Sequence, residues 1–591
     1  MSSLTGLRFL RPYLYHDILP VKPAAYARIF STHYRLRGKG PKAPSCETEG
    51  EFNVRRVKLK EGLDHSESRI KKLQLSGALH YPRIKKVGRI ATVKSCLEYC
   101  ATLPCGYSHE TDALTLHGRL ESVRKFGSKL VFMNLTEDGY SIQLEAEHGK
   151  ISKNQDVIVQ TPISFENLSK IMQRGDIVSA TGYPIRKDNG SATLQLTCLP
   201  HILTPSLAPV PRKLEDPETR IRNRHLDLLV NNDVAATLRL RSKITQHIRD
   251  FLVQDNFLEF QTPILADKAS GAMAQPFKTN ATEFPEKELA LRIAPELWLK
   301  RLVIGGLDRV FEIGPAFRNE GLDATHNPEF TTCEFYKAYA DIEDLISMTE
   351  KLVSGLVHLV NGLRVDPQHV KYMPFTELPR FEEDLYTKPF KRIEFIPAIE
   401  SAIEEKLPDL QKDDAREDLL QLFGKYDLEV PENPTLPRLL DKLASIYIEP
   451  RCSDPTFIMH QPSCMAPLSK SFLDPTTKQL VSARVELFIQ HQEIANMYEE
   501  ENSPFEQRYK FGEQLKFKDI ENPMDKVDEG YIQALEVGLP PTGGWGCGVD
   551  RLAMWLSGAK RISDVLPFGN LRNVVNLGAV VKSEMEEGEK V

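Results

Sequence analysis

The chain has 591 residues, of which 41% are hydrophobic and 27% are charged. These proportions are typical of an ordinary globular protein and exclude a disordered, collagen-like or coiled-coil chain. The formal net charge of −6 conceals an uneven distribution: residues 1–111 contain 20 Lys and Arg against 9 Asp and Glu, whereas residues 112–211 contain ten of each. The acidic excess therefore lies in the rest of the chain. This asymmetry indicates that the basic region binds a polyanion and that the acidic remainder of the chain has a different function.

The first 46 residues are rich in Lys and Arg, with Asp17 as the only acidic residue. That composition predicts a mitochondrial transit peptide over residues 1–46 and a place for the protein in the mitochondrial matrix. A basic tail on a cytoplasmic protein is the alternative. Residues 47–111 are predicted to form a basic N-terminal extension, which is either a solvated helix face or a surface that follows phosphates.

The nine cysteines are scattered and show no disulfide framework, which favours a reducing compartment. The one cluster worth weighing as a zinc site contains Cys96, Cys100, Cys105 and His109, but its irregular spacing favours free thiols. No run of about 18 apolar residues occurs, so we predict no transmembrane helix and no membrane partner.

Short alternating segments predict a small barrel over residues 112–204. Five-stranded barrels of this kind bind oligonucleotides on a strand face, where aromatic side chains stack on bases. The expected strands begin at Leu114, Lys129, Tyr140, Asp156, Asp176 and Ala192, and a helix is expected at Phe165–Gln173. A Pro-rich linker is predicted at 205–232, followed by a domain at 233–580 and a charged tail at 581–591. A helix is predicted over Val234–Gln254, which has helical periodicity. Irregular alternation of helices and strands beyond it predicts an α+β fold for the larger domain.

Three separated segments of the larger domain combine residues that suit a nucleotide site. The first runs from Phe251 to Pro263, where a helix leads into a strand. The second covers 310–336 and reads as strand, polar loop and strand, so that Arg318 and Glu320 would share one strand face. The third, Gly543–Leu552, has four Gly in six residues, which permit close backbone approach to a ligand, and then a helix around Asp550.

These three segments resemble the signature motifs of class II aminoacyl-tRNA synthetases. The segments Leu291–Lys300, His326–Thr331 and Gly538–Thr542 resemble the lysine-specific family, and the leader with Val565–Asn570 resembles its fungal mitochondrial type. The resemblance covers residues 112–570. It implies a five-stranded OB barrel for anticodon binding, followed by a class II catalytic domain built on an antiparallel sheet with flanking helices, and a homodimer.

The resemblance also implies roles for individual residues. ATP would be bound by Arg318, Glu320, His326, Asn327, Phe330, Glu486, Glu493 and Arg551, with Arg318 and Arg551 as catalytic residues. Glu486 and Glu493 would hold Mg²⁺, since carboxylates are hard oxygen ligands. Lysine would be bound by Glu296, Glu334, Tyr336, Asn496, Tyr498 and Glu500. The anticodon would contact Arg119, Phe132 and Gln143.

The implied activity is that of a lysine–tRNA ligase, which forms lysyl-adenylate and pyrophosphate from lysine and ATP and then transfers lysine to the 3′ end of tRNA(Lys). Three alternatives remain at this point. A ligase that adds lysine to a protein would lack the barrel, and an aspartyl or asparaginyl enzyme would not need Glu296 with Glu500. An RNA-binding protein without catalysis would be expected to lose residues such as Arg318 and Arg551.

Overall fold

The structure is a computed structural model that describes residues 65–84, 88–106, 112–151, 163–267, 274–365, 378–515 and 527–575. The predicted transit peptide and charged tail lie outside these ranges, as does His109. Contacts divide the chain after Glu67, and the elements below belong to the second unit, Ser68–Val591. None of the helices in the described ranges is long and apolar enough to cross a membrane.

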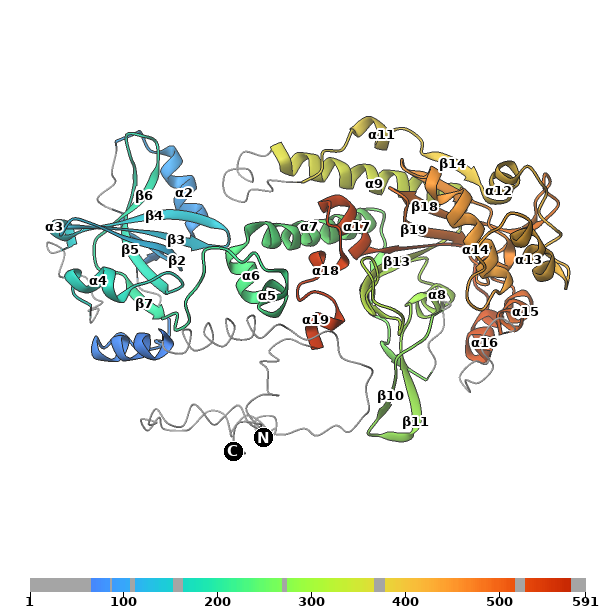
Figure 1. The fold of residues 1–591 in the computed structure, drawn as a ribbon, viewed down its shortest axis with the longest axis horizontal. Coiled ribbons are helices and arrows are strands. Elements are labelled where there is room, and N and C mark those ends of the chain that lie inside the picture. The colour runs from blue at the N-terminus through green and yellow to red at the C-terminus, as the bar shows by residue number, and fades with distance from the viewer. Residues whose placement is uncertain are drawn as a thin grey trace, which may run out of the picture. The chain divides into compact units, whose positions relative to one another are not determined.

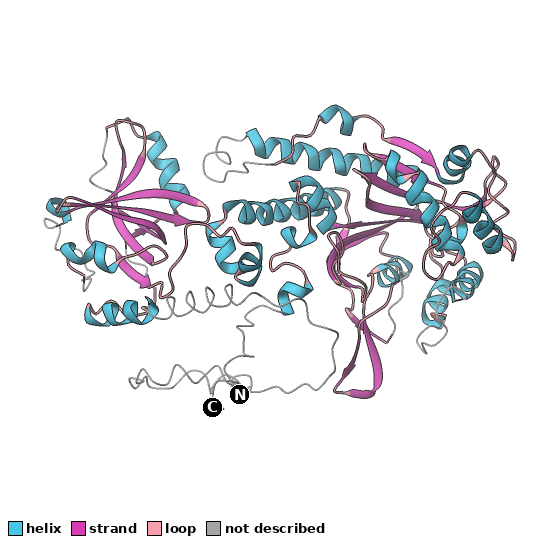
Figure 2. Cartoon of the chain, in the orientation of Figure 1, coloured by secondary structure: helices cyan, strands magenta, loops and turns pink. Residues whose placement is uncertain are grey.

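Five strands close a barrel in the order β2-β3-β4-β6-β5, and β5 pairs back to β2 (Figures 1 and 2). Neighbouring strands are antiparallel except β4 and β6, which are parallel. This confirms the predicted five-stranded barrel. Its strands are β2 (Leu114–Phe126), β3 (Leu130–Glu137), β4 (Tyr140–Glu147), β5 (Ile177–Arg186) and β6 (Ala192–Leu196). The strand expected from Asp156 lies outside the described residues. The expected helix at Phe165 is α4 (Phe165–Ile171).

Alternation of side chains decides which barrel residues face outward. In β3, Val131, Met133 and Leu135 are buried in the barrel core, because successive side chains of a strand point to opposite faces. Shorter elements flank the barrel: β1 (Arg89–Ile90), α2 (Val93–Thr102), α3 (His148–Ile151) and β7 (His201–Thr204). From the basic extension, Arg69 is 4% exposed and forms a 2.7 Å ion pair with Asp176. This arginine therefore has a structural role in the barrel, and it is unavailable to phosphates.

The larger domain is built on an eight-stranded sheet in the order β14-β15-β18-β19-β20-β13-β12-β8. The six strands from β15 to β12 are antiparallel, and parallel pairs occur only at the two edges. This confirms the predicted antiparallel sheet. Its strands are β8 (Leu258–Glu259), β12 (Arg309–Phe317), β13 (Glu329–Ala338), β14 (Lys391–Glu394), β15 (Thr456–Met459), β18 (Arg484–Ile489), β19 (Gln492–Glu499) and β20 (Thr542–Gly548).

Long helices cover the sheet. Helix α7 (Asn232–Gln254) presents Leu240, Ile244, Ile248 and Leu252 at four-residue spacing, and all four are fully buried. They pack in one apolar core with residues of α9 (Ile342–Val365) and α17 (Val549–Ser557). The helix predicted from Val234 is therefore confirmed. Its position explains why the third motif, at the start of α17, is held against the sheet.

Two groups of helices pack apart from this core. One surrounds the β14 edge and comprises α12 (Phe395–Ile403), α13 (Ala415–Lys425) and α14 (Leu436–Tyr447) (Figure 1). Helix α11 (Glu383–Thr387) precedes them in the chain and packs through Tyr386 in the core that contains α9. The other comprises α8 (Glu296–Ile304), α15 (Pro504–Leu515) and α16 (Glu529–Val537). The remaining elements are β9 (Leu265–Ala266), β10 (Lys278–Ala281), β11 (Phe284–Leu291), η3 (Glu449–Arg451), η4 (Ser463–Met465), β16 (Ser471–Leu473), β17 (Leu480–Ser482), α18 (Ile562–Val565) and α19 (Leu571–Val575).

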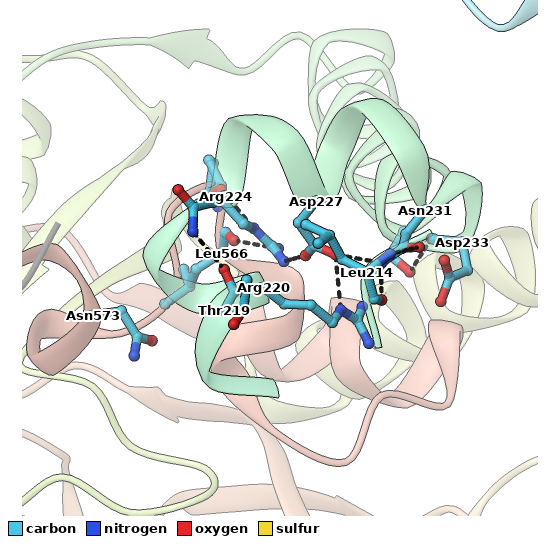
Figure 3. A network of polar contacts seen from close by, with 12 residues as sticks. Leu214, Thr219, Arg220, Arg224, Asp227, Asn231, Asp233, Leu566 and Asn573 are labelled. Carbon is cyan, nitrogen blue, oxygen red and sulfur yellow. Dashed lines mark hydrogen bonds and ion pairs between the residues drawn. The ribbon is translucent and has the colours of Figure 1, made fainter. Parts of the chain in front are cut away.

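The range predicted as a linker contains two helices, α5 (Pro217–Arg222) and α6 (Arg224–Val230). A buried polar network holds them (Figure 3). The fully buried carboxylate of Asp227 accepts from Arg220 at 2.8 Å, from Arg224 at 2.8 Å and from Asn231 at 2.6 Å. Arg224 also donates to the carbonyls of Leu566 and Pro567. This network joins the start of the larger domain to the segment after α18.

Candidate active site

A cavity of about 1480 Å³ opens on the sheet of the larger domain. The residues predicted for ATP, Mg²⁺ and lysine line it, with the exception of Glu500, which is fully buried beside it. The lining residues from that prediction are Glu296, Arg318, Glu320, His326, Asn327, Phe330, Glu334, Tyr336, Glu486, Glu493, Asn496, Tyr498 and Arg551. The tertiary structure thus brings residues from α8, the loop between β12 and β13, β13, β18, β19 and α17 to one cavity.

The loop between β12 and β13 presents Arg318 to the cavity. The expectation that Arg318 and Glu320 share a strand face was wrong, because β12 ends at Phe317. The backbone amide of Arg318 donates to Pro328, and that of Glu320 donates to the carbonyl of Arg318, so the two residues lie in a turn. The guanidinium of Arg318 lies 5.1 Å from the ring centroid of Phe330. Its buried Nε has no hydrogen-bond partner in the described structure, which leaves a donor for a ligand.

Arg551 also lines the cavity, from the first turn of α17. Its Nη2 is 2.8 Å from His326 Nε2, and its Nη1 is 3.4 Å from Glu493 Oε2. His326 in turn contacts Asp323 at 2.7 Å. Asn327 points its amide oxygen to the backbone of Leu571 and so anchors the loop to α19. Arg318 and Arg551 therefore line the same cavity from two separate motifs.

Sequence reasoning missed Arg241 of α7, which orders this wall. Its Nη2 donates to Asp550 Oδ1 at 2.6 Å and to Thr331 Oγ1 at 2.8 Å. Asp550 Oδ2 accepts from the Thr331 backbone at 2.7 Å. This triad holds the start of α17, and with it the turn that carries Arg551, against β13. No local pattern around Arg241 indicates this role, because its partners are 90 and 309 residues away.

A second missed contact joins the first motif to the second. Arg292 and Glu312 are each 3% exposed and form a 2.6 Å ion pair. The other carboxylate oxygen of Glu312 accepts from the hydroxyl of Thr262 at 2.7 Å. Both charges are paired and hydrogen-bonded, as burial requires. The pair positions the strand that leads to Arg318.

The predicted lysine pocket contains three carboxyl groups: Glu296 and Glu500 are buried, and Glu334 is half-buried. Tyr498 donates to Glu296 at 2.6 Å, and Tyr336 donates to Glu334 at 3.1 Å. Burial, reinforced by the charge of Glu296, raises the pKa of Glu334 to about 8. Burial also raises the pKa of Glu500 well above its ordinary value, against the opposing charge of Lys300. A cationic ligand would relieve this accumulation of negative charge.

Glu486 and Glu493 come from adjacent antiparallel strands, β18 and β19. Glu486 accepts from Gln461 at 2.5 Å and contacts Arg484, and burial is the main cause that raises its pKa to about 7. Across the described ranges, no three His, Cys, Asp or Glu side chains gather closely enough to hold a metal ion by themselves. Two carboxylates suit Mg²⁺ when substrate phosphates complete its shell, and these residues fit that requirement.

The cysteines weighed as a zinc site lie elsewhere: Cys96 and Cys100 are buried on α2, and Cys105 is exposed.

The three residues predicted for the anticodon lie on one outer face of the barrel. Arg119 of β2 is paired with Thr136 of β3, and Gln143 of β4 is paired with Asn134. Thr136, Asn134 and Phe132 share a face because they are spaced by two. Arg119 donates to the carbonyl of Gly175 at 2.7 Å. Lys187 lies 5.2 Å from the ring centroid of Phe132 and adds a cation to this face.

The fold and the cavity define a class of enzyme, and comparison with known proteins agrees. The family model for class II tRNA synthetases (D, K and N) matches residues 216–572, so the chain belongs to that class. The chain is 38% identical over 517 residues to the mitochondrial lysine–tRNA ligase of Schizosaccharomyces pombe, covering 86% of this chain and 93% of that one.

Two further fungal relatives agree. The lysine–tRNA ligase cla4 of Cladosporium cladosporioides is 35% identical over 557 residues, covering 92% of this chain and 88% of the relative. The mitochondrial lysine–tRNA ligase of Saccharomyces cerevisiae is 36% identical over 507 residues, covering 80% and 84%. Within class II, the chain therefore belongs to the lysine–tRNA ligases.

Proposed function

We propose that this protein activates lysine with ATP and transfers it to tRNA(Lys) in the mitochondrial matrix. The observation that carries the proposal is that one cavity contains two arginines from separate motifs and the carboxyl groups of Glu296 and Glu334, with Glu500 buried beside it. The arginines suit a triphosphate, because guanidinium groups match phosphate oxygens. The carboxylates suit an amino acid with two ammonium groups, since an unpaired buried ammonium is costly. Family membership favours the same activity.

The first step joins lysine to AMP. The lysine carboxylate attacks the α-phosphorus of ATP, a P–O bond forms, and the bond to pyrophosphate breaks with pyrophosphate as the leaving group. Arg318 would bind the α-phosphate through its free Nε and the rest of its guanidinium. Arg551 would neutralise charge on the adenylate side, and Phe330 would stack on adenine. Positioning and charge neutralisation account for such a displacement without a general base from the protein.

Glu320 would approach the adenine amino group, and His326 and Asn327 would lie along the triphosphate. Glu486 and Glu493 would hold Mg²⁺, which would supply charge neutralisation on the phosphates when bound. In the second step the terminal 3′-hydroxyl of tRNA attacks the lysyl carbonyl, and AMP leaves. Glu296 and Glu334 would bind the lysine α-ammonium, and Tyr336, Asn496, Tyr498 and Glu500 would surround its side chain.

We also propose that the barrel face around Phe132 reads the anticodon. Phe132 offers a ring for stacking, and Arg119 and Gln143 offer hydrogen-bond donors on the same face. Replacement of Phe132 by Ala should weaken charging of tRNA(Lys) while leaving lysine-dependent ATP–pyrophosphate exchange unchanged. Equal loss in both assays would contradict a role limited to tRNA.

A homodimer is proposed through the segment of the first motif. Val253, Leu258, Ile264 and Leu265 are each at least 40% exposed although apolar, and β8 lies at the edge of the sheet. Light scattering of the full-length protein should give twice the mass of one chain; the mass of one chain would contradict the dimer.

The proposed matrix location draws on the basic composition of residues 1–46 and on the mitochondrial relatives. A fluorescent protein carrying residues 1–46 should enter mitochondria; retention in the cytoplasm would favour the alternative.

The decisive assay is lysine-dependent ATP–pyrophosphate exchange with the full-length protein. The wild-type protein should catalyse exchange with lysine and not with aspartate or asparagine. Arg318→Ala and Arg551→Ala should each reduce the exchange rate by roughly 100-fold or more, with a smaller effect on lysine affinity. Intact exchange in Arg318→Ala would refute the assignment of that residue. Lysine-dependent labelling of a protein in place of tRNA would favour the protein-modifying alternative.

A further inference from the structure

Lys300 lies inside the proposed lysine pocket, although sequence reasoning gave it no role. It belongs to α8 and is fully buried. Its Nζ is 2.6 Å from Glu296 Oε1 and forms an ion pair with Glu500 Oε2. The ring centroids of Tyr336 and Tyr498 lie 5.8 and 5.6 Å from the same nitrogen. The contacts of this lysine are therefore the residues proposed to bind the substrate.

Glu500 depends on Lys300 for its position. Apart from this ion pair, neither carboxylate oxygen of Glu500 has a hydrogen-bond partner among the described residues. Gly544 leaves the space that the carboxylate occupies, because a Cβ at that position would collide with Glu500 Oε1. Glu500 is thus a buried carboxyl group with one cationic partner and unused acceptor capacity. Unused capacity in a fully buried carboxylate points to a further ligand.

The charges of the pocket can be compared with those of the substrate. Glu296, Glu334 and Glu500 contribute three carboxylates, and Lys300 contributes one ammonium. When all four are ionised, two negative charges remain. Lysine has two ammonium groups, and its carboxylate is directed to ATP in the first step. Two net negative charges therefore match the two ammonium groups of one diamino acid.

We propose that Lys300 is a positioning and specificity-determining residue, whose ammonium orients Glu296 and Glu500 and cancels one of the three carboxylate charges. The remaining charge of the pocket then matches the two ammonium groups of one lysine molecule. This inference rests on the proposed function, because it concerns the lysine pocket of that reaction. It differs from a purely structural role, in which Lys300 would support α8 without affecting substrate selection. It also differs from a blocking role, in which Lys300 would compete with the substrate ammonium.

The three roles predict different kinetics for Lys300→Met, which preserves an unbranched side chain and removes the charge. As a positioning residue, its loss should raise the KM for lysine roughly 10- to 100-fold, because a buried ion pair is broken and Glu500 loses its partner. The KM for ATP should change by less than about twofold. Equal rises in the KM for lysine and in the KM for ATP would instead indicate a folding defect. As a blocking residue, its loss should lower the KM for lysine.

The pH profile provides a second readout. Without the ammonium, Glu500 should keep its proton to higher pH, because the charge of Lys300 opposes the rise in its pKa, so the KM for lysine in Lys300→Met should fall more steeply as pH rises than in the wild-type protein. A structural role would not change this profile. The titratable groups that face Lys300 or its partners are Glu296 of α8, Glu334 and Tyr336 of β13, Tyr498 of β19, Glu500, and Tyr531 of α16.

Lys510 offers a matched control in α15. It is also buried and pairs with one carboxylate, Glu501, at 2.7 Å, but it does not contact the proposed lysine-binding residues in the described structure. Lys510→Met should lower the melting temperature while leaving the KM for lysine within about twofold of wild type. Should Lys300→Met fail to fold, Lys300→Gln removes the charge and keeps hydrogen-bond donors.

The experiment is lysine-dependent ATP–pyrophosphate exchange by the full-length wild-type protein and these variants, with KM for lysine and ATP measured across pH. A raised KM for lysine with a steeper pH dependence supports the role of Lys300. An unchanged or lower KM for lysine in a folded variant overturns it while leaving the proposed function intact. An inactive wild-type protein refutes the proposed function, and the role of Lys300 with it.

Discussion

Replacement of Asp227 by Asn should destabilise the larger domain through one buried network. Asp227 is fully buried and accepts from Arg220, Arg224 and Asn231 (Figure 3). An Asn has nearly the same shape, but its amide lacks the charge and directs two donors toward neighbours that are themselves donors. Arg224, which is 7% exposed, would keep a buried charge without its anion. The side-chain shape is otherwise preserved, so the change is confined to the charge and the hydrogen bonds of this one side chain.

The expected size follows from the burial of both partners. Removal of one partner of a buried ion pair costs about 3–5 kcal/mol. For a domain of about 350 residues, an unfolding entropy of about 2.1 cal/mol/K per residue converts this into a fall of about 4–7 °C in melting temperature. The effect should reach the segment at Leu566 and Pro567, because Arg224 donates to both carbonyls. Hydrogen exchange there should accelerate together with exchange in α6.

The assay is thermal unfolding of the full-length protein followed by circular dichroism. Asp233→Asn is the control: Asp233 is exposed in the first turn of α7, where it favours the helix by only about 0.3–1 kcal/mol. The control should therefore lower the melting temperature by about 1 °C. A fall of less than about 1 °C in Asp227→Asn would show that the network contributes little net stability, and the reasoning would be refuted.

Two further predictions concern the lysine pocket. Because the pKa of Glu334 is raised to about 8, this carboxyl is mostly protonated in the empty pocket at neutral pH and must lose its proton to pair with an ammonium. The KM for lysine should thus fall by up to about tenfold per pH unit as pH rises from about 6 to 8, and Glu334→Gln should abolish this dependence; an identical slope in the variant would contradict the assignment. Gly544→Ala should raise the KM for lysine by about tenfold or more, since its Cβ would meet Glu500 Oε1 and lie 2.7 Å from Tyr336 Cε1. Gly362→Ala in α9, with nothing within 4 Å of the added Cβ, should leave kinetics unchanged, and an equal effect in both variants would exclude a local cause.

The sequence alone determined the elements whose signals are local. Alternation in Leu130–Glu137 indicated a barrel strand, because a half-buried strand repeats every two residues. Four-residue spacing from Leu240 to Leu252 indicated α7, because one face of a helix repeats every 3.6 residues. Motif residues such as Arg318 and Arg551 were also identifiable, since unusual residue types stand at defined spacings. These features depend on neighbours within a few residues and are therefore readable along the chain.

Only the tertiary structure decided which distant residues act together. It ended β12 before Arg318, placed Arg241 against Asp550 and inserted Lys300 between Glu296 and Glu500. The pairs Arg241–Asp550 and Lys300–Glu500 depend on packing between elements that lie far apart in the chain, and no local periodicity encodes such contacts, whereas Lys300 and Glu296 are only four residues apart on α8. Lys300 illustrates the difference: along the chain it is an ordinary helical lysine, and burial beside two carboxylates makes it part of the pocket. The sequence identified the chemistry of the residues, and the fold determined which charges meet, because desolvation and pairing exist only once the chain is packed.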